Sequence, residues 1–207
     1  WKRFYERVHR LRRHHYSSRS RRLPIPVVSV GNLHFGGTGK TPLVAAIATH
    51  LQKAGRQVVV VSRGYGRRSR GIHVVSIGDG LIGNPLDAGD EPAMLASVLQ
   101  GVQIVVGTDP YEAGCLALES LDPCPGVVLL DDGFSHVQLA RDLDLLVFPH
   151  HDVFAGGRLP PLGSLREPLA AAAAATAVVV TGIPEPPAGG GARVVAALGA
   201  FGFEGPG

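Results

Sequence analysis

Short valine-rich runs alternate along the chain with longer segments in which apolar residues recur every three or four positions. The short runs predict buried strands, and the longer segments predict amphipathic helices. Strands are expected at 27–30, 58–61, 74–77, 103–106, 127–130, 143–148 and 177–180. Helices are expected over 42–53, after a loop at 87–92 through about Leu99, and over 111–121. This alternation predicts an α/β domain: a mostly parallel sheet with helices on both faces.

Proline, glycine and alanine clusters divide the chain into three regions. Pro24 and Pro26 separate an arm at 1–23 from a domain at 24–182. Within the domain, the alanine run at 170–175 is expected to be a helical spacer. The stretch 184–191 is typical of a linker, so 183–207 is interpreted as a linker and the start of a second domain that is largely missing.

The charges are distributed unevenly. Residues 1–23 hold nine Lys or Arg against one acid, whereas the rest holds eleven against sixteen acids. Trp1, Phe4, Tyr5, Val8 and Leu11 recur at helical spacing, which predicts a basic amphipathic helix. Such a helix suits an anionic membrane surface. A solvated arm packed on the domain is the alternative, and nucleic acid, the competing polyanion, is not the expected partner.

Other compositional features narrow the class of protein. No run of 18 apolar residues occurs in the sequence, so no segment is expected to cross a bilayer. Cys115 and Cys124 lack metal-ligand spacing and are expected to be free thiols in a reducing cytosol. The chain begins at Trp1 and ends in a Gly- and Pro-rich tail, which is consistent with a fragment.

A glycine-rich turn between the first strand and the first helix carries the most specific chemistry. It contains Gly36, Gly37, Thr38, Gly39, Lys40 and Thr41. Main-chain amides in such a turn bind a polyphosphate, the lysine contacts the β- and γ-phosphates, and the threonine hydroxyl binds Mg²⁺. His34 stands where the full pattern has glycine. The alternative is a tight strand-to-helix turn with an incidental lysine.

Two acidic pairs are candidates for metal binding and proton transfer. Asp131 and Asp132 follow the strand at 127–130, which is typical of a Walker B segment that holds Mg²⁺; a simple Asp-Gly turn is the alternative. Asp90 and Glu91 precede a helix, where acids also act as caps. Asp90 is a candidate base toward an incoming hydroxyl.

Basic side chains occupy the neighbouring loops. Arg63 follows the second strand, His136 follows the Asp131–Asp132 pair, and Arg158 and Arg166 lie in the extended loop 157–168. Arginine forks suit phosphate recognition, although ordinary surface ion pairs or a structural histidine would fit the same pattern. The phosphate loop, the Arg63 loop and the acidic pair all follow strands, so we expect them at one edge of the sheet.

With these motifs assembled, the chain resembles the tetraacyldisaccharide 4′-kinase (lipid A 4′-kinase) family over about residues 20–182. The resemblance is carried by 26–32 with 36–42, Ser62-Arg63-Gly64-Tyr65-Gly66, Gly89-Asp90-Glu91-Pro92, Asp131-Asp132-Gly133-Phe134 with His136, and 157–168. It implies ATP-dependent transfer of the γ-phosphate to the 4′-hydroxyl of an acylated glucosamine disaccharide. It also implies docking on the cytoplasmic face of the bacterial inner membrane through a basic, apolar N-terminal helix.

The resemblance also implies residue roles. Asp90 is expected to be the base, assisted in the family by a histidine of a C-terminal domain. Lys40 and Thr41 are expected to contact phosphate and Mg²⁺, with Asp131 and Asp132 as the metal and transition-state acids and Glu91 and Glu167 assisting.

The chain departs from the family pattern at several positions. Ser135 replaces a glutamine, Thr108 and Pro110 replace arginines, and Gly156 replaces an asparagine. The substitutions at Ser135, Thr108 and Pro110 keep a non-catalytic nucleotide-binding relative as one alternative, and a nucleotide-hydrolysing switch is another. The absence of an Asn-Lys-x-Asp guanine-reading motif argues against the switch.

Overall fold

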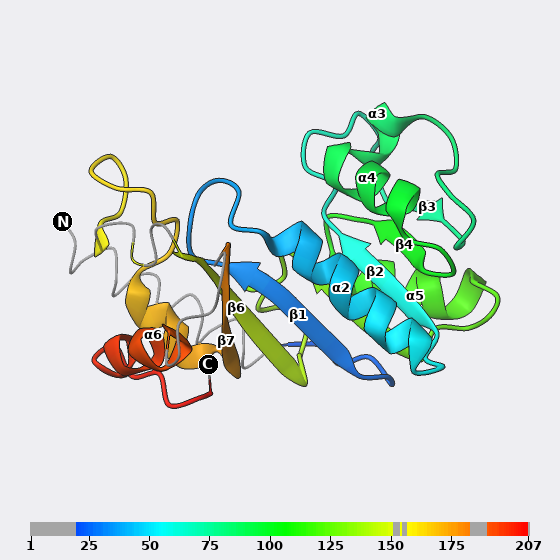
Figure 1. The fold of residues 1–207 in the computed structure, drawn as a ribbon. Helices are drawn as coiled ribbons and strands as arrows, with labels where there is room; N and C mark the ends of the chain where they lie inside the picture. The colour runs from blue at the N-terminus through cyan, green and yellow to red at the C-terminus, as the bar shows by residue number, and fades with distance from the viewer. Residues whose placement is uncertain (1–19, 151–153, 155–156, 183–189, 207) are drawn as a thin grey trace.

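The computed structural model describes residues 20–150, 154, 157–182 and 190–206. These residues form a seven-stranded sheet in the order β3-β4-β2-β5-β1-β6-β7 (Figure 1). The strands are β1 (Val27–Asn32), β2 (Val58–Ser62), β3 (His73–Ser76), β4 (Gln103–Val106), β5 (Val127–Asp131), β6 (Leu143–Pro149) and β7 (Ala177–Thr181). Every neighbouring pair is parallel except β3 and β4, which are antiparallel. The predicted, mostly parallel α/β sheet is confirmed.

Helices cover both faces of this sheet. Those described are α2 (Lys40–Lys53), α3 (Pro85–Ala88), α4 (Asp90–Val98), α5 (Pro110–Ser120), α6 (Gly190–Gly199) and the 3₁₀ helix η3 (Leu169–Ala174). Helices α2 and α4 share one core with β2 and β5, while α5 packs against the opposite side of the same strands. None of these helices has both the length and the apolar character needed to cross a membrane.

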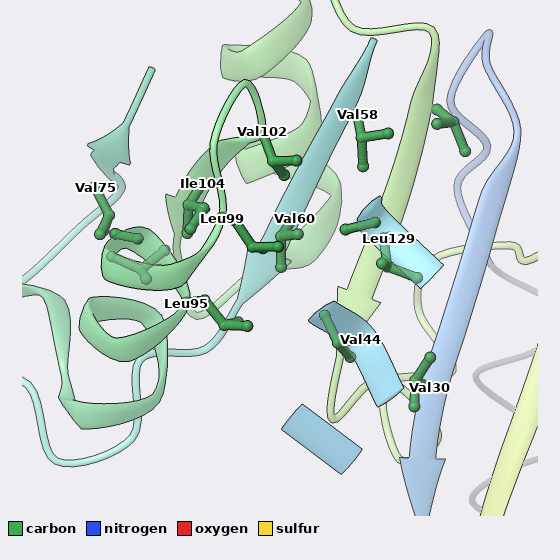
Figure 2. Close-up of a cluster of buried hydrophobic side chains, with 14 of the residues drawn as sticks. Val30, Val44, Val58, Val60, Val75, Leu95, Leu99, Val102, Ile104 and Leu129 are labelled. Carbon is green, nitrogen blue, oxygen red and sulfur yellow. The ribbon is translucent and has the colours of Figure 1, made fainter. Parts of the chain in front are cut away.

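The core beneath α2 and α4 explains why the central strands are almost pure valine and leucine. Val30, Val60 and Leu129 of three adjacent strands are fully buried against Val44 of α2 and Leu95 of α4 (Figure 2). Central parallel strands are buried on both faces, so they carry continuous apolar runs instead of alternating ones. In β2 and β5 the first polar residues, Ser62 and Asp131, are the last residues of the strands.

The prediction of a loop at 87–92 is wrong. Residues 85–88 form α3, and α4 begins directly at Asp90. The Asn84 side chain accepts a hydrogen bond from the amide of Leu86, and Pro85 occupies the first turn, which together favour a helix start. Gly89, with φ 91°, then separates two helices that are only one residue apart.

A separate core lies at the β7 edge of the sheet. Leu169 and Ala172 of η3 are buried there together with Val194 and Leu198 of α6 and with Phe203. The alanine run is therefore a packed 3₁₀ helix and not a mere spacer. Of the predicted linker at 184–191, residues 184–189 lie outside the described chain, and α6 begins at Gly190.

The last residues of the basic arm are attached to the domain. Arg21 forms ion pairs with Asp109 and Glu112 and lies 4.2 Å over the ring of Tyr111. Arg22 pairs with Asp142 at 2.7 Å, and the neighbouring Leu23 side chain is buried. The predicted amphipathic helix and its aromatic stripe lie at 1–19, outside the described residues.

Candidate active site at the carboxyl ends of the central strands

The phosphate loop (36–41), the Arg63 loop that follows β2, and the Asp131–Asp132 pair meet at one edge of the sheet, as the sequence predicts. Lys40 Nζ lies 3.7 Å from Asp132 Oδ1, and the Ser62 hydroxyl donates a hydrogen bond of 3.3 Å to Asp131 Oδ2. This follows from topology, because β5 is paired with both β1 and β2 in the same direction. The three strands therefore end side by side.

The phosphate loop ends at an open helix N-terminus. Gly39 caps α2 with φ 77° and no side-chain hydrogen bond, and the first turn holds no acid. A side chain there would also lie about 3.1 Å from Thr181, so both backbone angle and space favour glycine. Asn32 donates to the Thr38 hydroxyl at 2.7 Å, and the Thr181 hydroxyl donates to the Thr38 carbonyl at 2.6 Å. The loop is thus held from both sides, and the amide end of α2 has no side-chain cap, which suits an anion.

His34, at the position where the full pattern has glycine, belongs to the wall of this loop. Its side chain is buried and its ring packs edge-on against Phe148, with centroids 5.7 Å apart. The backbone of His34 forms an isolated antiparallel β-bridge with Leu165, and the Phe35 amide donates a hydrogen bond to the Ser164 carbonyl at 2.7 Å. These contacts bring the 157–168 loop, with Arg166, against the phosphate loop.

Asp132 is held in an uncommon conformation. Its φ of 57° lies in the left-handed region. Arg166 binds both carboxylate oxygens, with Nη1 2.7 Å from Oδ2, and also donates to the Asn32 carbonyl through Nε at 3.2 Å. Burial opposes ionisation of Asp132, but the hydrogen bonds and charge of Arg166, helped by Lys40, hold the pKa of Asp132 below its usual value. Arg166, a candidate substrate ligand, therefore contacts this acid directly.

Asp131 is in the opposite electrostatic situation. Its side chain is buried, and burial together with the charges of Glu91 and Asp132 raises its pKa to about 7, against the opposing effects of Lys40 and Ser62. Its Oδ1 atom is buried with no hydrogen-bond partner in the described structure. An ionised acid in this place needs a positive partner, which a divalent cation would supply.

The donor set nearby fits such a cation. Thr41, at the start of α2, donates to Glu91 Oε1 at 3.4 Å, and Glu91 interacts electrostatically with Asp131. Hydroxyl and carboxylate oxygens are the ligands that Mg²⁺ prefers, and it usually takes the rest from water and phosphate. The described residues contain no group of three acids, histidines or cysteines that would enclose a metal by themselves. The arrangement suits an ion shared with a nucleotide.

Asp90 lies at the first turn of α4, and its side chain is exposed. The Ser62–Gly66 segment touches this helix start, because a Cβ on Gly89 would lie 3.0 Å from the Tyr65 carbonyl. The Arg63 loop and the Asp90–Glu91 pair therefore lie next to each other at the rim of the site. Both acids are exposed; the Glu91 carboxylate accepts a hydrogen bond from Thr41, and Asp90 is the second acid of this rim that an incoming molecule can reach.

The remaining candidates are divided between the interior and the rim. His136 and Arg63 line a small pocket together with Ser62 and Asp131, and burial, followed by the charge of Arg63, lowers the pKa of His136. Glu167 is buried and accepts a hydrogen bond of 2.5 Å from Ser135. Arg158 is exposed, and its carbonyl accepts a hydrogen bond from the Leu165 amide.

Sequence patterns missed two supporting residues. Asn32, the last residue of β1, holds Thr38 with its side chain and Arg166 with its carbonyl. Arg141 donates to the carbonyls of Gly133 and His136. A polar residue ending a buried strand was the available signal for Asn32, whereas nothing in the local pattern marks Arg141.

Comparison with known proteins agrees with this geometry. The profile of the family described as "Tetraacyldisaccharide-1-P 4'-kinase" (LpxK) matches residues 2–195. The chain belongs to this family. It is 49% identical over 152 residues to the tetraacyldisaccharide 4′-kinase of Geobacter sulfurreducens, covering 73% of this chain and 42% of the relative. The kinase of Neisseria meningitidis serogroup C is 47% identical over 154 residues, covering 72% and 42%. The chain thus spans less than half the length of these tetraacyldisaccharide 4′-kinases.

A solved LpxK structure shares the fold. The chain aligns with LpxK from Aquifex aeolicus, described as an "apo" form in complex with ATP, with a TM-score of 0.78 and 42% identity over 86% of this chain and 56% of that one. The signal recognition particle receptor FtsY from Elizabethkingia anophelis aligns over 96% of this chain and 64% of its own with a TM-score of 0.54 at 19% identity. The second likeness shows the fold alone.

Proposed function

We propose that this chain is the nucleotide-binding part of a kinase that transfers the γ-phosphate of ATP to the 4′-hydroxyl of a tetraacylated glucosamine disaccharide in lipid A biosynthesis. One observation carries the proposal: Lys40, Thr41, Asp131 and the Arg166-bound Asp132 surround the open amide end of α2. Membership of the tetraacyldisaccharide-1-P 4′-kinase family supports the choice of acceptor, and the ATP in the related LpxK structure supports the choice of nucleotide.

The phosphate loop would bind the triphosphate. Main-chain amides of Gly36 to Thr41 would hold its β- and γ-oxygens, and Lys40 would exchange its 3.7 Å contact with Asp132 for the charge that develops on the transferred group. Phosphoryl transfer requires little covalent chemistry from the protein, so positioning and charge neutralisation account for most of the expected rate enhancement.

Mg²⁺ is the proposed metal. Thr41 and Asp131 would hold it, with Glu91 next to them, and when bound it neutralises phosphate charge. Of the two strand-end acids, Asp132 has both oxygens on Arg166, while Asp131 keeps Oδ1 unpartnered. We therefore assign the ion to Asp131 and give Asp132 the role of orienting Lys40 and Arg166. Glu167 would assist indirectly, by accepting the hydrogen bond from Ser135 in the loop that follows Asp132.

The acceptor would approach from the rim formed by α4 and the Arg63 loop. An open pocket of about 460 Å³ lies along the Arg63 loop and the residues that follow it, and is lined by Arg63, Arg67, Arg70 and Thr108, among others. Guanidinium groups suit the phosphate that the family description places on the disaccharide. These arginines would supply positive charge on the side where Thr108 and Pro110 replace the arginines typical of the family; His136 and Arg158 are further candidate contacts.

Asp90 is the proposed base. The 4′-hydroxyl would lose its proton to the Asp90 carboxylate as its oxygen bonds to the γ-phosphorus and the bond to the leaving ADP oxygen breaks. The test is transfer of label from [γ-³²P]ATP to the lipid acceptor, run with protein covering the full length of the family. We expect Asp90→Asn to lower kcat by roughly 10²-fold with little change in the affinity for ATP, because general-base catalysis contributes about that much.

Asp87→Asn is the matched control: Asp87 is an exposed acid of α3, three residues before Asp90, and the variant should keep full activity. Undiminished transfer by Asp90→Asn would remove the proposed base. GTP replacing ATP at equal efficiency, with label appearing only as inorganic phosphate, would favour a nucleotide-hydrolysing switch instead.

The basic arm is proposed to dock on the cytoplasmic face of the inner membrane. Nine basic residues within 1–23 support this, and Arg21 and Arg22 attach the root of the arm to the domain. Sedimentation with vesicles tests it: we expect binding to vesicles rich in anionic lipid that weakens with added salt. Equal binding to neutral vesicles, or none to either, would contradict the proposal.

A further inference from the structure

Arg141 occupies a nearly buried position between β5 and β6, outside the motifs that define the site. Its side chain is 12% exposed, and Nη2 lies 3.0 Å from Oδ2 of Asp144, a β6 residue whose side chain is 6% exposed. The other terminal nitrogen, Nη1, donates to the carbonyl oxygens of Gly133 at 3.2 Å and His136 at 3.0 Å. One guanidinium thus connects two carbonyls of the same loop to strand β6.

Stability alone is a weak explanation for this arrangement. Burying two charges costs much of what their attraction returns, and apolar residues of similar volume commonly serve a core as well or better. The geometry offers a different explanation. A planar fork fixes the distance between its acceptors, so the pair sets the shape of the loop 132–136 relative to β6.

That loop carries groups of the proposed active site. Asp132, which faces Lys40 and Arg166, is held at φ 57°, and His136 lines the pocket beside Asp131 and Arg63. A left-handed aspartate persists where its surroundings hold it. Arg166 holds the Asp132 side chain from one side, and Arg141 holds the backbone that follows it from the other.

We propose that Arg141 is a positioning residue for phosphoryl transfer, which acts by holding the 132–136 loop so that Asp132 and His136 keep their places beside Lys40. Asp144 in turn orients Arg141. The inference rests on the proposed kinase function for its kinetic consequence but not for its structural one.

The decisive comparison is between Arg141→Met and Arg141→Lys. Methionine keeps most of the packing volume and removes the charge and the fork. Lysine keeps the charge beside Asp144 but cannot reproduce the planar contacts to both carbonyls. Arg56→Met is the control, because it makes the same change at an exposed arginine just beyond the end of α2 that donates to neither carbonyl.

We expect kcat for phosphate transfer to fall roughly 10–100-fold in Arg141→Met and by a smaller factor in Arg141→Lys, with the dissociation constant for ATP changed less than about threefold, since small misplacements of catalytic groups cost rates of this size. Amide hydrogen exchange over 132–140 should accelerate in both variants. His136→Ala should cost less in the Arg141→Met background than in the wild type, because the two changes act through one loop.

Unchanged kcat and unchanged exchange in Arg141→Lys would overturn the proposal, as would a lowered melting temperature with full kcat, which marks a purely structural pair. If Arg141→Met fails to fold, Arg141→Lys decides alone. If the wild type transfers no phosphate to the lipid, the proposed function fails, and the exchange measurement still decides whether Arg141 holds the loop.

Discussion

Replacing Lys40 by alanine should lower kcat/KM for phosphate transfer by roughly 10²–10³-fold, about 3–4 kcal/mol of transition-state stabilisation. The reason is the placement of its ammonium group, 3.7 Å from Asp132 at the amide end of α2, where charge develops on the transferred phosphoryl group. The fold should survive, because Arg166 continues to neutralise Asp132. The measurement is initial-rate kinetics with ATP and the lipid acceptor.

Lys53→Ala is the matched control, since Lys53 is exposed in the last turn of the same helix. It removes an identical charge and should leave the rates within about twofold of the wild type, because distant exposed charges are largely screened. A Lys40→Ala variant that retains kcat/KM within threefold would mean that the phosphates bind elsewhere.

The Asp131→Asn variant should lose activity and gain stability at once. Activity falls, by roughly 10²-fold or more, because the acid assigned to the ion is neutralised. Stability rises because the folded-state pKa of Asp131 is about 7, far above the 3.8 expected for the unfolded chain. A raised folded pKa contributes stability that is fully present below pH 4 and is lost as the pH rises toward and through 7.

Urea unfolding without Mg²⁺ or nucleotide, at pH 5 and at pH 8, measures this directly. We expect Asp131→Asn to exceed the wild type in unfolding free energy by about 1–3 kcal/mol at pH 8 and to differ less at pH 5. Comparing the two proteins at each pH cancels the opposite contribution of His136, whose folded pKa is lowered. Equal stability at both pH values would show that Asp131 is not held as a strained carboxylate.

Asp142→Asn is the control of opposite sign. A hydrogen bond from Arg22, followed by one from the Val27 amide, lowers the pKa of Asp142. Its stabilising contribution is therefore present above pH 4 and lost as the pH falls below that value, so Asp142→Asn should destabilise slightly at pH 8. Observing both signs in one chain would establish that the effect at Asp131 comes from its own surroundings.

The sheet could be predicted because its physics is local. Valine runs at 58–61 and 127–130 have no stable alternative to burial, and polar residues begin where those strands end. The antiparallel direction of β3 and the short helix α3 were not predicted. Both depend on the path of residues 63–89, which add β3 at the edge of the sheet beside β4.

The sequence predicts which residues gather at this edge of the sheet, but not the contacts that they make with one another. Lys40, Thr41 and the Asp131–Asp132 pair lie in motifs whose geometry is determined by the strand-loop-helix unit. The Arg166–Asp132 contact joins positions 34 residues apart. The contacts of Arg141 depend on the pairing of β6 with β1, which the local sequence does not show. The raised pKa of Asp131 likewise depends on burial and on the charge of Glu91, which lies in helix α4.

The decisive measurement is a crystal structure, with a non-hydrolysable ATP analogue and Mn²⁺, of protein that covers the full length of the family. We expect the triphosphate on the main-chain amides of residues 36–41, Lys40 turned from Asp132 to the phosphates, and anomalous Mn²⁺ density next to Thr41 and Asp131. Triphosphate bound at any other edge of the sheet, or metal density remote from Asp131, would contradict it.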